Sequence, residues 1–500
     1  MKKYRPEIII FIVNAIYMIL ELIASRVLSP YFGNSNMVWT SVIGIILLSS
    51  SLGNYLGGVI ADRKNLNKNL KLILLISGVL IMLIPIIQGS VLRIITLLIN
   101  DIKIGAIIST MILFFIPSML IGLLSPIIVK LRMKDLEEVG KVSGKISALA
   151  TLGSITGTFL GGFYLIPSFG CNQIMFVLAI IMFLLIFVAE ENIVKKKTNK
   201  LILCVLICIM LCLTLFYFYI KNNEENAKKV LNGEFGITVS YDTEYGRVLI
   251  YNLEDQFGGH RTLNIDRGNE SATYINEEKR YDLVYEYTKY YDLMFKSSNE
   301  IKDTLMIGGA GYSYPKYYIS NYLDKNMDVV EIDGKVVEIA KKYFYLDQLI
   351  EEFDLENNNR LNLITQDGRV YLNKNTKKYD AILNDAFAGE SPAKTMATLE
   401  AVEKIYNSLN ENGVYLTNII SSIGGENSKF IKAEVNTLKQ VFKNVYVVPC
   451  RDINDLELRQ NNMVIATDAE LVIENVVNLD TNNTIILTDN YCPIDSLTNS

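Results

Sequence analysis

Residues 304–311 read TLMIGGAG, a short apolar strand that runs straight into a glycine-rich turn. Glycine suits this turn because the chain must bend sharply and let a ligand approach the backbone with no Cβ in the way. A helix is expected from Tyr314 or Pro315 onward. The order of strand, glycine turn and helix is typical of the first unit of a nucleotide-binding α/β sheet.

Three more strands follow, and each ends in an acid. The strand MDVVEID (residues 327–333) contains Glu331 about 20 residues after the glycines, where a carboxylate receives ribose hydroxyls. The strand LNLI (361–364) leads to Asp367 and Gly368, and the strand YDAILND (379–385) ends in Asp385. This alternation predicts a doubly wound, Rossmann-like sheet whose four strand tips share one carboxyl edge.

The set of acids distinguishes between ligands. An NAD site explains the glycines and Glu331, but not an Asp-Gly pair after the third strand followed by an acid after the fourth. Sites for S-adenosyl ligands use that set, with the third-strand aspartate near the adenine and the fourth tip near the sulfonium. We therefore expect an adenosyl sulfonium ligand, with these binding residues: Gly308, Gly309, Gly311, Glu331, Asp367 and Gly368.

The segment before this sheet predicts a small β domain. Residues 237–241, 247–251 and 261–265 alternate apolar and polar side chains, and turn residues that include Gly258 and Gly259 separate them. We expect residues 222–300 to form a linker and this β cap, and residues 301–500 to form the Rossmann-like domain.

The first 221 residues predict a polytopic membrane domain. Half of the whole chain is apolar and 20% is charged, but the long apolar runs all lie upstream of Asn222. A bilayer crossing needs about 20 residues. On that criterion seven spans are expected, at approximately residues 7–29, 37–61, 70–97, 104–129, 145–167, 171–190 and 201–220.

Lysine and arginine in alternate short loops predict a cytoplasmic N-terminus for this multi-pass protein of the cell membrane. The relevant residues are Lys2, Lys3, Arg5, Arg63, Lys64, Lys68, Lys71, Lys130, Arg132, Lys134, Lys195, Lys196, Lys197 and Lys200. Seven spans would then place the second half outside the cell. A re-entrant fifth and sixth pair, or a seventh span lying on the surface, would return it to the cytoplasm.

Five segments between about residues 241 and 495 resemble the spermidine synthases, the polyamine aminopropyltransferases, and in particular their membrane-fused, multi-pass branch. The segments are LMIGGAG, VVEIDGKVVEIAKKYF, TQDGRVYL, YDAILNDAFAGESPA and LTDNYCPID. The resemblance implies that Glu331 binds the ribose of decarboxylated S-adenosylmethionine, and that Asp367 and Gly368 contact its adenine. It makes Asp385 the proton acceptor toward the attacking amine, and it matches Pro392 to a proline of the substrate loop.

The implied reaction needs no cofactor besides this donor substrate. A primary amine of putrescine loses a proton, attacks the aminopropyl carbon and releases methylthioadenosine, so one carboxylate can both position the amine and accept its proton. Tyr287 and its neighbours Tyr285, Tyr290 and Tyr291 either flank the polyamine or simply pack. The only histidine, His260, cannot form a metal site alone.

The expected partners are polyamine and adenosyl sulfonium substrates and the lipid membrane. With a net charge of −5 and no basic stripe, nucleic acid is not expected. The resemblance further implies a homodimer or homotetramer.

Three positions depart from the family pattern and leave the acceptor open. Ala388 replaces a second aspartate, Gly311 replaces an aspartate of the glycine loop, and Gly246 replaces a glutamine that follows a tyrosine. Two alternatives therefore stand. One is an S-adenosylmethionine-dependent methyltransferase. The other is a non-catalytic sensor of an adenosyl ligand coupled to a half-transporter bundle, because GGVIADRK (57–64) is similar to a loop of major-facilitator transporters.

Overall fold

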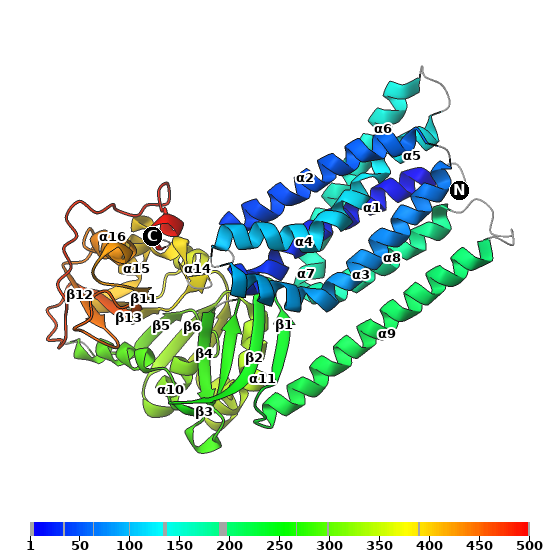
Figure 1. The fold of residues 1–500 in the computed structure, drawn as a ribbon. Coiled ribbons are helices and arrows are strands. Elements are labelled where there is room, and N and C mark those ends of the chain that lie inside the picture. The colour runs from blue at the N-terminus through cyan, green and yellow to red at the C-terminus, as the bar shows by residue number, and fades with distance from the viewer. Residues whose placement is uncertain are drawn as a thin grey trace. The chain divides into compact units, whose positions relative to one another are not determined.

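A computed structural model describes residues 5–33, 36–63, 65–99, 101–133, 138–189, 198–266, 268–297, 300–388 and 391–498. Two compact units contain them: Met1–Asn226 with Ser240–Arg247, and Ala227–Val239 with Val248–Ser500. The first is built mainly of helices and the second of strands and helices (Figure 1). Among the loop charges expected to set the orientation, Lys2, Lys3, Lys64, Lys134 and Lys195 to Lys197 lie outside the described residues.

The helical unit begins with long apolar helices. Its elements are α1 (Arg5–Phe32), α2 (Asn36–Ala61), α3 (Leu66–Leu98), α4 (Ile102–Gly122), α5 (Leu124–Arg132), α6 (Val139–Leu160), a π-helical turn (Gly161–Leu165), α7 (Ile166–Ser168), α8 (Cys171–Ala189) and α9 (Thr198–Leu231). In the described part of the chain, seven helical stretches have the length and apolar composition of membrane spans. This number agrees with the sequence prediction.

Glycines allow close helix packing inside this unit. A Cβ on Gly153 would lie 2.1 Å from the carbonyl oxygen of Phe11, and one on Gly157 would lie 2.3 Å from that of Ala15. Helices α1 and α6 therefore approach at backbone distance. Gly53 plays the same part between α2 and α4, because its Cβ would lie 2.3 Å from the carbonyl oxygen of Met119.

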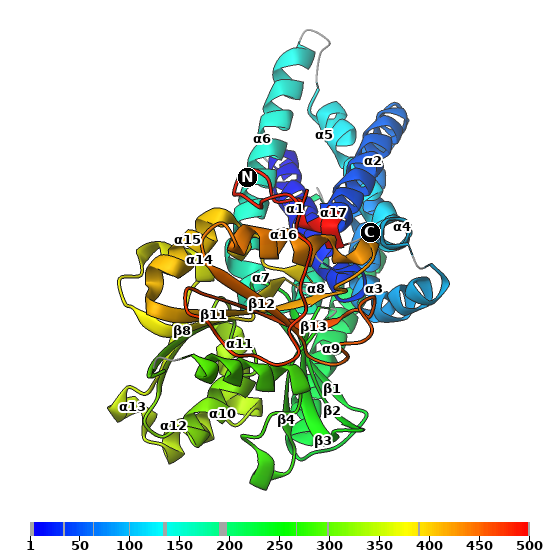
Figure 2. The same ribbon diagram turned by 90° about the vertical axis from the view of Figure 1, so that its left-hand side faces the viewer.

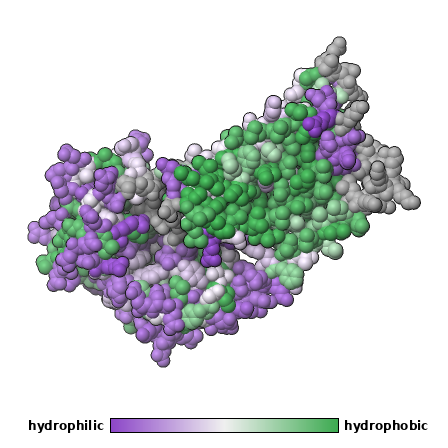
Figure 3. Space-filling model, viewed as in Figure 1, coloured by the Kyte–Doolittle hydropathy of each residue, from purple (hydrophilic) through white to green (hydrophobic). Residues whose placement is uncertain are grey.

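The outward side chains of these helices are largely apolar, as the green surface in Figure 3 shows. Leu97 and Leu98 are 77% and 78% exposed, and Phe163 is 70% exposed. Apolar side chains displayed over so many helical turns suit contact with lipid rather than with water.

Helix α9 is longer than expected. We predicted a span at residues 201–220, but the helix continues to Leu231. The continuation is polar, and Lys221 lies near Glu225 one turn later, with 3.9 Å between the charged atoms. Such a segment extends a helix into water, where hydropathy gives no signal.

Four strands form the β cap, in the order β1 (Thr238–Asp242), β2 (Arg247–Asp255), β3 (Gly258–Ile265) and β4 (Gly268–Tyr274), and β2, β3 and β4 pair antiparallel. The first three were predicted. The fourth was missed because its sequence, GNESATY, has almost no apolar alternation.

The second sheet has seven strands in the order β12-β13-β11-β8-β5-β6-β7. Their bounds are β5 (Asp303–Ile307), β6 (Asn326–Glu331), β7 (Leu361–Thr365), β8 (Tyr379–Asn384), β11 (Leu409–Ser421), β12 (Asn444–Pro449) and β13 (Gln460–Thr467). Strands β11, β8, β5, β6 and β7 pair in parallel. Strand β13 runs antiparallel to both neighbours. The doubly wound architecture is confirmed, with an antiparallel hairpin added at one edge.

Helices cover both faces of this sheet (Figure 2). On one face, α10 (Ser313–Asn321), α11 (Gly334–Tyr343) and α12 (Leu346–Glu352) pack against Met306, Val329 and Leu383. On the other, α14 (Gly368–Lys374), α15 (Leu399–Ser408) and α16 (Lys429–Leu438) pack against Leu305, Val330 and Ile382. Both cores follow from strands with apolar side chains on each face.

Candidate active site

The tips of four neighbouring strands meet at one edge of the sheet. The spatial order β8-β5-β6-β7 puts Asp385, Gly308, Glu331 and Asp367 side by side. Backbone hydrogen bonds hold successive tips in register: Asp385 donates to Ile307 (2.8 Å), Gly308 to Val330 (2.9 Å) and Gln366 to Glu331 (3.0 Å). The expected shared edge is therefore present.

The chain reverses its direction across the sheet between β5 and β8. Strands β6 and β7 follow β5 on one side, whereas β8 lies on the other. Open α/β sheets bind ligands at such a switch point. Gly308 lies here with φ of +95°, and a Cβ on it would lie 2.5 Å from the carbonyl oxygen of Asp385. No other residue fits this position without moving one of the two strands.

Glu331 holds the glycine-rich turn. Its Oε2 accepts hydrogen bonds from the backbone N–H groups of Gly309 and Ala310, each at 2.9 Å. Its Oε1 accepts one from Asp333 N–H at 3.0 Å. Burial raises the pKa of this carboxyl, and the three N–H groups oppose that rise by stabilising the carboxylate. Glu331 thus links the turn before α10 to the start of α11.

Gly311 has a steric reason to lack a side chain. Its N–H donates to Ser271 Oγ of β4 at 3.0 Å, and a Cβ would lie 2.6 Å from the Cβ of Ser271. Strand β4 therefore occupies the space where an aspartate of the family pattern would extend. The replacement of that aspartate by Gly311 therefore goes with the position of β4 beside the glycine-rich turn.

Asp367 and Gly368 begin helix α14. The Asp367 side chain accepts a hydrogen bond from Val370 N–H at 2.9 Å, which caps the helix. A Cβ on Gly368 would lie 2.5 Å from Ile307 Cγ2, so the glycine lets α14 approach the end of β5. Both residues lie at the edge of the sheet expected for the adenine end of the ligand.

Asp385 is held in a hydrogen-bonded pocket. Its Oδ1 accepts from Asn418 Nδ2 at 3.0 Å, and its Oδ2 accepts from the Tyr287 hydroxyl at 3.2 Å. Burial raises the pKa of Asp385, while the hydrogen bonds from Asn418 and Tyr287 act in the opposite direction. A carboxyl whose pKa is raised toward neutrality is suited to accept a proton from an amine.

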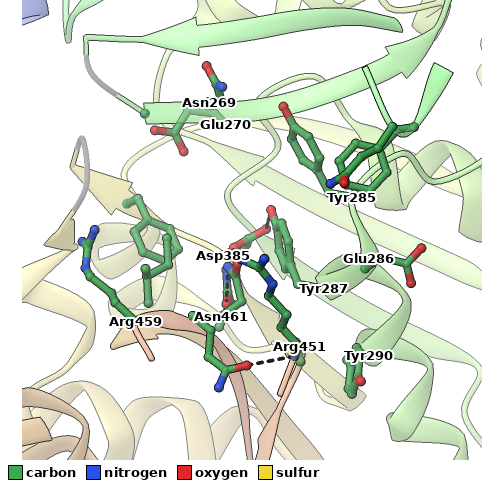
Figure 4. Close-up of a pocket in the computed structure, with 18 residues that line it drawn as sticks. Asn269, Glu270, Tyr285, Glu286, Tyr287, Tyr290, Asp385, Arg451, Arg459 and Asn461 are labelled. Atoms are coloured by element: carbon green, nitrogen blue, oxygen red, sulfur yellow. Dashed lines mark hydrogen bonds between the residues drawn. The ribbon is translucent and has the colours of Figure 1, made fainter. Parts of the chain in front are cut away.

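Two cavities meet at Asp385 (Figure 4 shows the larger one). The larger has a volume of about 790 Å³ and reaches Asn418, Arg451 and Arg459. The smaller, about 30 Å³, is lined by Gly308, Gly309 and Ala310 of the glycine-rich turn. Four residues line both: Glu270, Tyr285, Tyr287 and Asp385. The shared residues mark the place where two ligands would meet.

The tyrosines divide into two groups. Tyr285, Tyr287 and Tyr290 line the larger cavity, and the rings of Tyr285 and Tyr287 stack with centroids 6.4 Å apart. Tyr291 is completely buried and packs against Tyr314, with ring centroids 5.1 Å apart. The packing interpretation therefore applies to Tyr291, whereas the other three tyrosines border a cavity.

The remaining predicted positions lie in short strands and turns. Pro392 pairs with Phe387, and Ala388 pairs with Ser391, in the small sheet of β9 (Phe387–Ala388) and β10 (Ser391–Pro392). Gly246 closes the turn between β1 and β2, where Thr243 N–H donates to its carbonyl oxygen at 2.9 Å. Gly246 is absent from the described residues that line either cavity.

Several cavity residues were not predicted. Glu270 comes from β4, Asn418 from β11, and Arg451 and Arg459 from the loop between β12 and β13. A polar loop between two apolar runs, residues 444–449 and 460–467, is a hairpin signal that would have brought the two arginines together. In the part of the chain that the structure describes, no group of three histidine, cysteine or acidic residues is arranged to hold a metal ion.

Comparison with known proteins matches residues 291–455 to the spermine/spermidine synthase domain. The polyamine aminopropyltransferase of Thermoplasma volcanium is 30% identical over 214 residues, which are 42% of this chain and 70% of that protein. The chain belongs to the spermidine synthase family. The family enzyme of Vibrio vulnificus is 35% identical over 145 residues, 28% of this chain, and that match spans only 44% of the relative's length.

One spermidine synthase relative also matches the helical half. Polyamine aminopropyltransferase 2 of Aquifex aeolicus is 23% identical over 393 residues, 77% of this chain and 73% of that protein. Because the residues after α9 make up little more than half of the chain, this match must extend into the helices. Among solved structures, a probable spermidine synthase from Corynebacterium glutamicum is similar, with a TM-score of 0.39 and 20% identity over 48% of this chain and 83% of that one.

Proposed function

We propose that this chain is a membrane-bound aminopropyltransferase. It transfers the aminopropyl group of decarboxylated S-adenosylmethionine to a primary amine, with putrescine as the simplest acceptor, and gives spermidine and methylthioadenosine. The observation that supports this most is the position of Asp385, a half-buried carboxyl that lines both cavities at the switch point of the sheet.

The donor would lie along the strand tips from β8 to β7. A carboxylate offers about four lone-pair sites. Three backbone N–H groups occupy Glu331, which leaves acceptor capacity for a ribose hydroxyl. Asp367 and Gly368 would contact the adenine. The aminopropyl arm would then pass over Gly308 and Gly309 into the smaller cavity.

The transfer is a substitution at the carbon next to the sulfonium. The ammonium group of the acceptor binds Asp385 and gives a proton to its carboxylate. The freed amine nitrogen attacks the carbon, a C–N bond forms, the C–S bond breaks, and its electron pair neutralises the sulfonium as methylthioadenosine leaves. Asp385 therefore contributes both position and proton acceptance.

Glu270 supplies the carboxylate that Gly311 lacks. Its neighbour Ser271 fills the space beside Gly311, and Glu270 lines the small cavity between the glycine-rich turn and Tyr287. We assign Glu270 to the terminal ammonium group of the aminopropyl arm. In this chain the carboxylate that binds the ammonium group of the aminopropyl arm would come from β4, and not from the loop after β5.

The test uses the purified full chain in detergent with decarboxylated S-adenosylmethionine and putrescine. The proposal predicts release of methylthioadenosine in equal amount to an aminopropylated amine identified by its mass. S-adenosylmethionine is offered in parallel. Formation of S-adenosylhomocysteine with a methylated acceptor, and no aminopropyl product, would instead establish a methyltransferase.

A further inference from the structure

We propose that the preferred acceptor is a diamine that also carries a carboxylate, held by Arg451 and Arg459, which line the larger cavity. This inference rests on the proposed aminopropyl transfer and narrows its acceptor class.

The two arginines lie on the acceptor side of the site. Both line the larger cavity, and neither lines the smaller one next to the glycine-rich turn. Figure 4 shows the Arg451 side chain beside Asp385 and Tyr287, and the Arg459 side chain on the other side of Asn461. An anion bound by them would therefore belong to the acceptor rather than to the aminopropyl arm.

A buried glutamine fixes this loop. Gln460, which is 5% exposed, accepts hydrogen bonds at its Oε1 from the backbone N–H groups of Arg451 and Asp452, each at 2.9 Å. Its Nε2 donates to the carbonyl oxygen of Asp452 at 2.7 Å. Arg459 precedes Gln460 directly in the chain. One buried side chain thus ties the backbone of Arg451 to the residue that follows Arg459.

The same loop is linked to the catalytic aspartate. Asn461 Nδ2 donates to Asn418 Oδ1 at 3.1 Å, and Asn418 Nδ2 donates to Asp385 Oδ1 at 3.0 Å. The amine site and the arginines are therefore parts of one hydrogen-bonded framework. A site that joins a carboxylate to nearby guanidinium groups suits a ligand that carries both an amine and an anion.

The charged side chains that line the larger cavity are of both signs, and Arg451 and Arg459 are its cations. Among the described residues that line it, the acids are Glu270, Glu286 and Asp385. Glu286 already binds Lys289 at 2.9 Å, and Glu270 lies where the two cavities join. A second ammonium group directed toward the arginines meets like charge. A carboxylate in that place gains charge-assisted hydrogen bonds that guanidinium groups form in a fixed geometry.

Matched acceptors test the proposal. Ornithine is putrescine with one added carboxylate, and lysine is cadaverine with one added carboxylate. The kcat/KM for aminopropyl transfer is measured for each pair, with product mass and methylthioadenosine as readouts. We expect the carboxylated member to exceed its diamine by about tenfold or more, the size of a charge-assisted hydrogen bond.

Variants of the two arginines provide a second test of the proposal. Arg451→Gln and Arg459→Gln should lower kcat/KM for ornithine and leave that for putrescine equal or higher, so the ratio falls by about tenfold. Arg451→Lys keeps the charge and should retain part of the preference. Arg63→Gln, at an exposed position after α2, is the control and should leave the ratio unchanged.

The outcomes separate this inference from the proposed function. Efficient transfer to putrescine, with no preference for ornithine and no effect of the arginine variants, overturns the acceptor class and leaves aminopropyl transfer intact. No transfer to any of the four acceptors overturns both. A third outcome is group transfer from S-adenosylmethionine itself at a rate that Arg451→Gln lowers. This result would mean that the arginine binds the carboxylate of the donor, and it would overturn the assignment of the arginines to the acceptor.

Discussion

Gly308 and Asp385 touch at the switch point of the seven-stranded sheet, where a Cβ on the glycine would lie 2.5 Å from the carbonyl oxygen of the aspartate. The contact joins the tip of β5, where the donor would bind, to the tip of β8, where the amine would lose its proton. The geometry of the reaction therefore depends on a residue with no side chain.

Gly308→Ala should disturb both stability and donor binding. The φ of +95° is strained for alanine, and the new methyl group would meet the Asp385 backbone. We expect a loss of about 1–3 kcal/mol in the free energy of unfolding and weaker methylthioadenosine binding. Thermal unfolding with and without methylthioadenosine measures both. Gly259→Ala, which has no contact under 3.7 Å and no positive φ, is the control; equal behaviour of the two variants would refute the account of Gly308.

The acidic limb of the pH profile should shift when Tyr287 changes. Transfer needs the ionised form of Asp385, so kcat should rise with pH through the raised pKa of this residue. The Tyr287 hydroxyl donates to the carboxylate and thereby favours the ionised form. Tyr287→Phe removes that bond, raises the pKa further and should move the limb to higher pH.

Tyr285→Phe is the matched control for this shift, because Tyr285 lines the same cavity and stacks on Tyr287. In the described part of the chain, the side-chain hydrogen bonds to Asp385 come from Tyr287 and Asn418, and none comes from the Tyr285 hydroxyl. The kcat profile of the Tyr285 variant should keep the wild-type limb. A limb that stays in place in Tyr287→Phe would show that Asp385 is not the titrating base.

Glu270→Gln should weaken donor use without removing adenosyl binding. The variant loses the charge assigned to the ammonium group of the aminopropyl arm. We expect KM for decarboxylated S-adenosylmethionine to rise about tenfold, and affinity for methylthioadenosine, which lacks that arm, to stay unchanged. Glu286→Gln, whose carboxylate binds Lys289, serves as comparison. Equal KM values for Glu270→Gln and the wild type would remove Glu270 from this role.

The side of the membrane on which α9 ends is a further prediction. The donor is made inside cells, so the proposed activity requires the segment after α9 to face the cytoplasm. A cysteine introduced at Asn222 should react with an impermeant reagent only after the cell is opened, as should one at Lys68, at the start of α3 on the side that the loop charges predict to be cytoplasmic. This result means that one of the seven long apolar helices does not cross the bilayer. Labelling of Asn222 in intact cells would contradict the proposed activity.

The strand tips could be predicted from the sequence because the information is local. Each strand of the parallel sheet is a short apolar run, and the polar residue that ends it, such as Glu331 or Asp385, must emerge at the carboxyl edge. The seven apolar helices were predictable for the same reason, since length and hydropathy need no tertiary context.

The rest of the site depends on contacts between distant segments. Glu270 lies in a polar strand whose place is set by pairing with β3, and only the structure reveals that Ser271 fills the space beside Gly311. Arg451 and Arg459 line one cavity because β12 and β13 form a hairpin at the edge of the sheet. No local pattern links either group to Asp385.

The most direct measurement is the rate of aminopropyl transfer by Asp385→Asn, together with its affinity for methylthioadenosine. The account predicts that kcat falls by about 10²–10⁴, the usual contribution of a general base, while methylthioadenosine still binds. Asp480→Asn, an exposed aspartate whose side chain accepts from Asn482 N–H, should keep the wild-type rate. Transfer by Asp385→Asn at the wild-type rate would contradict the central claim.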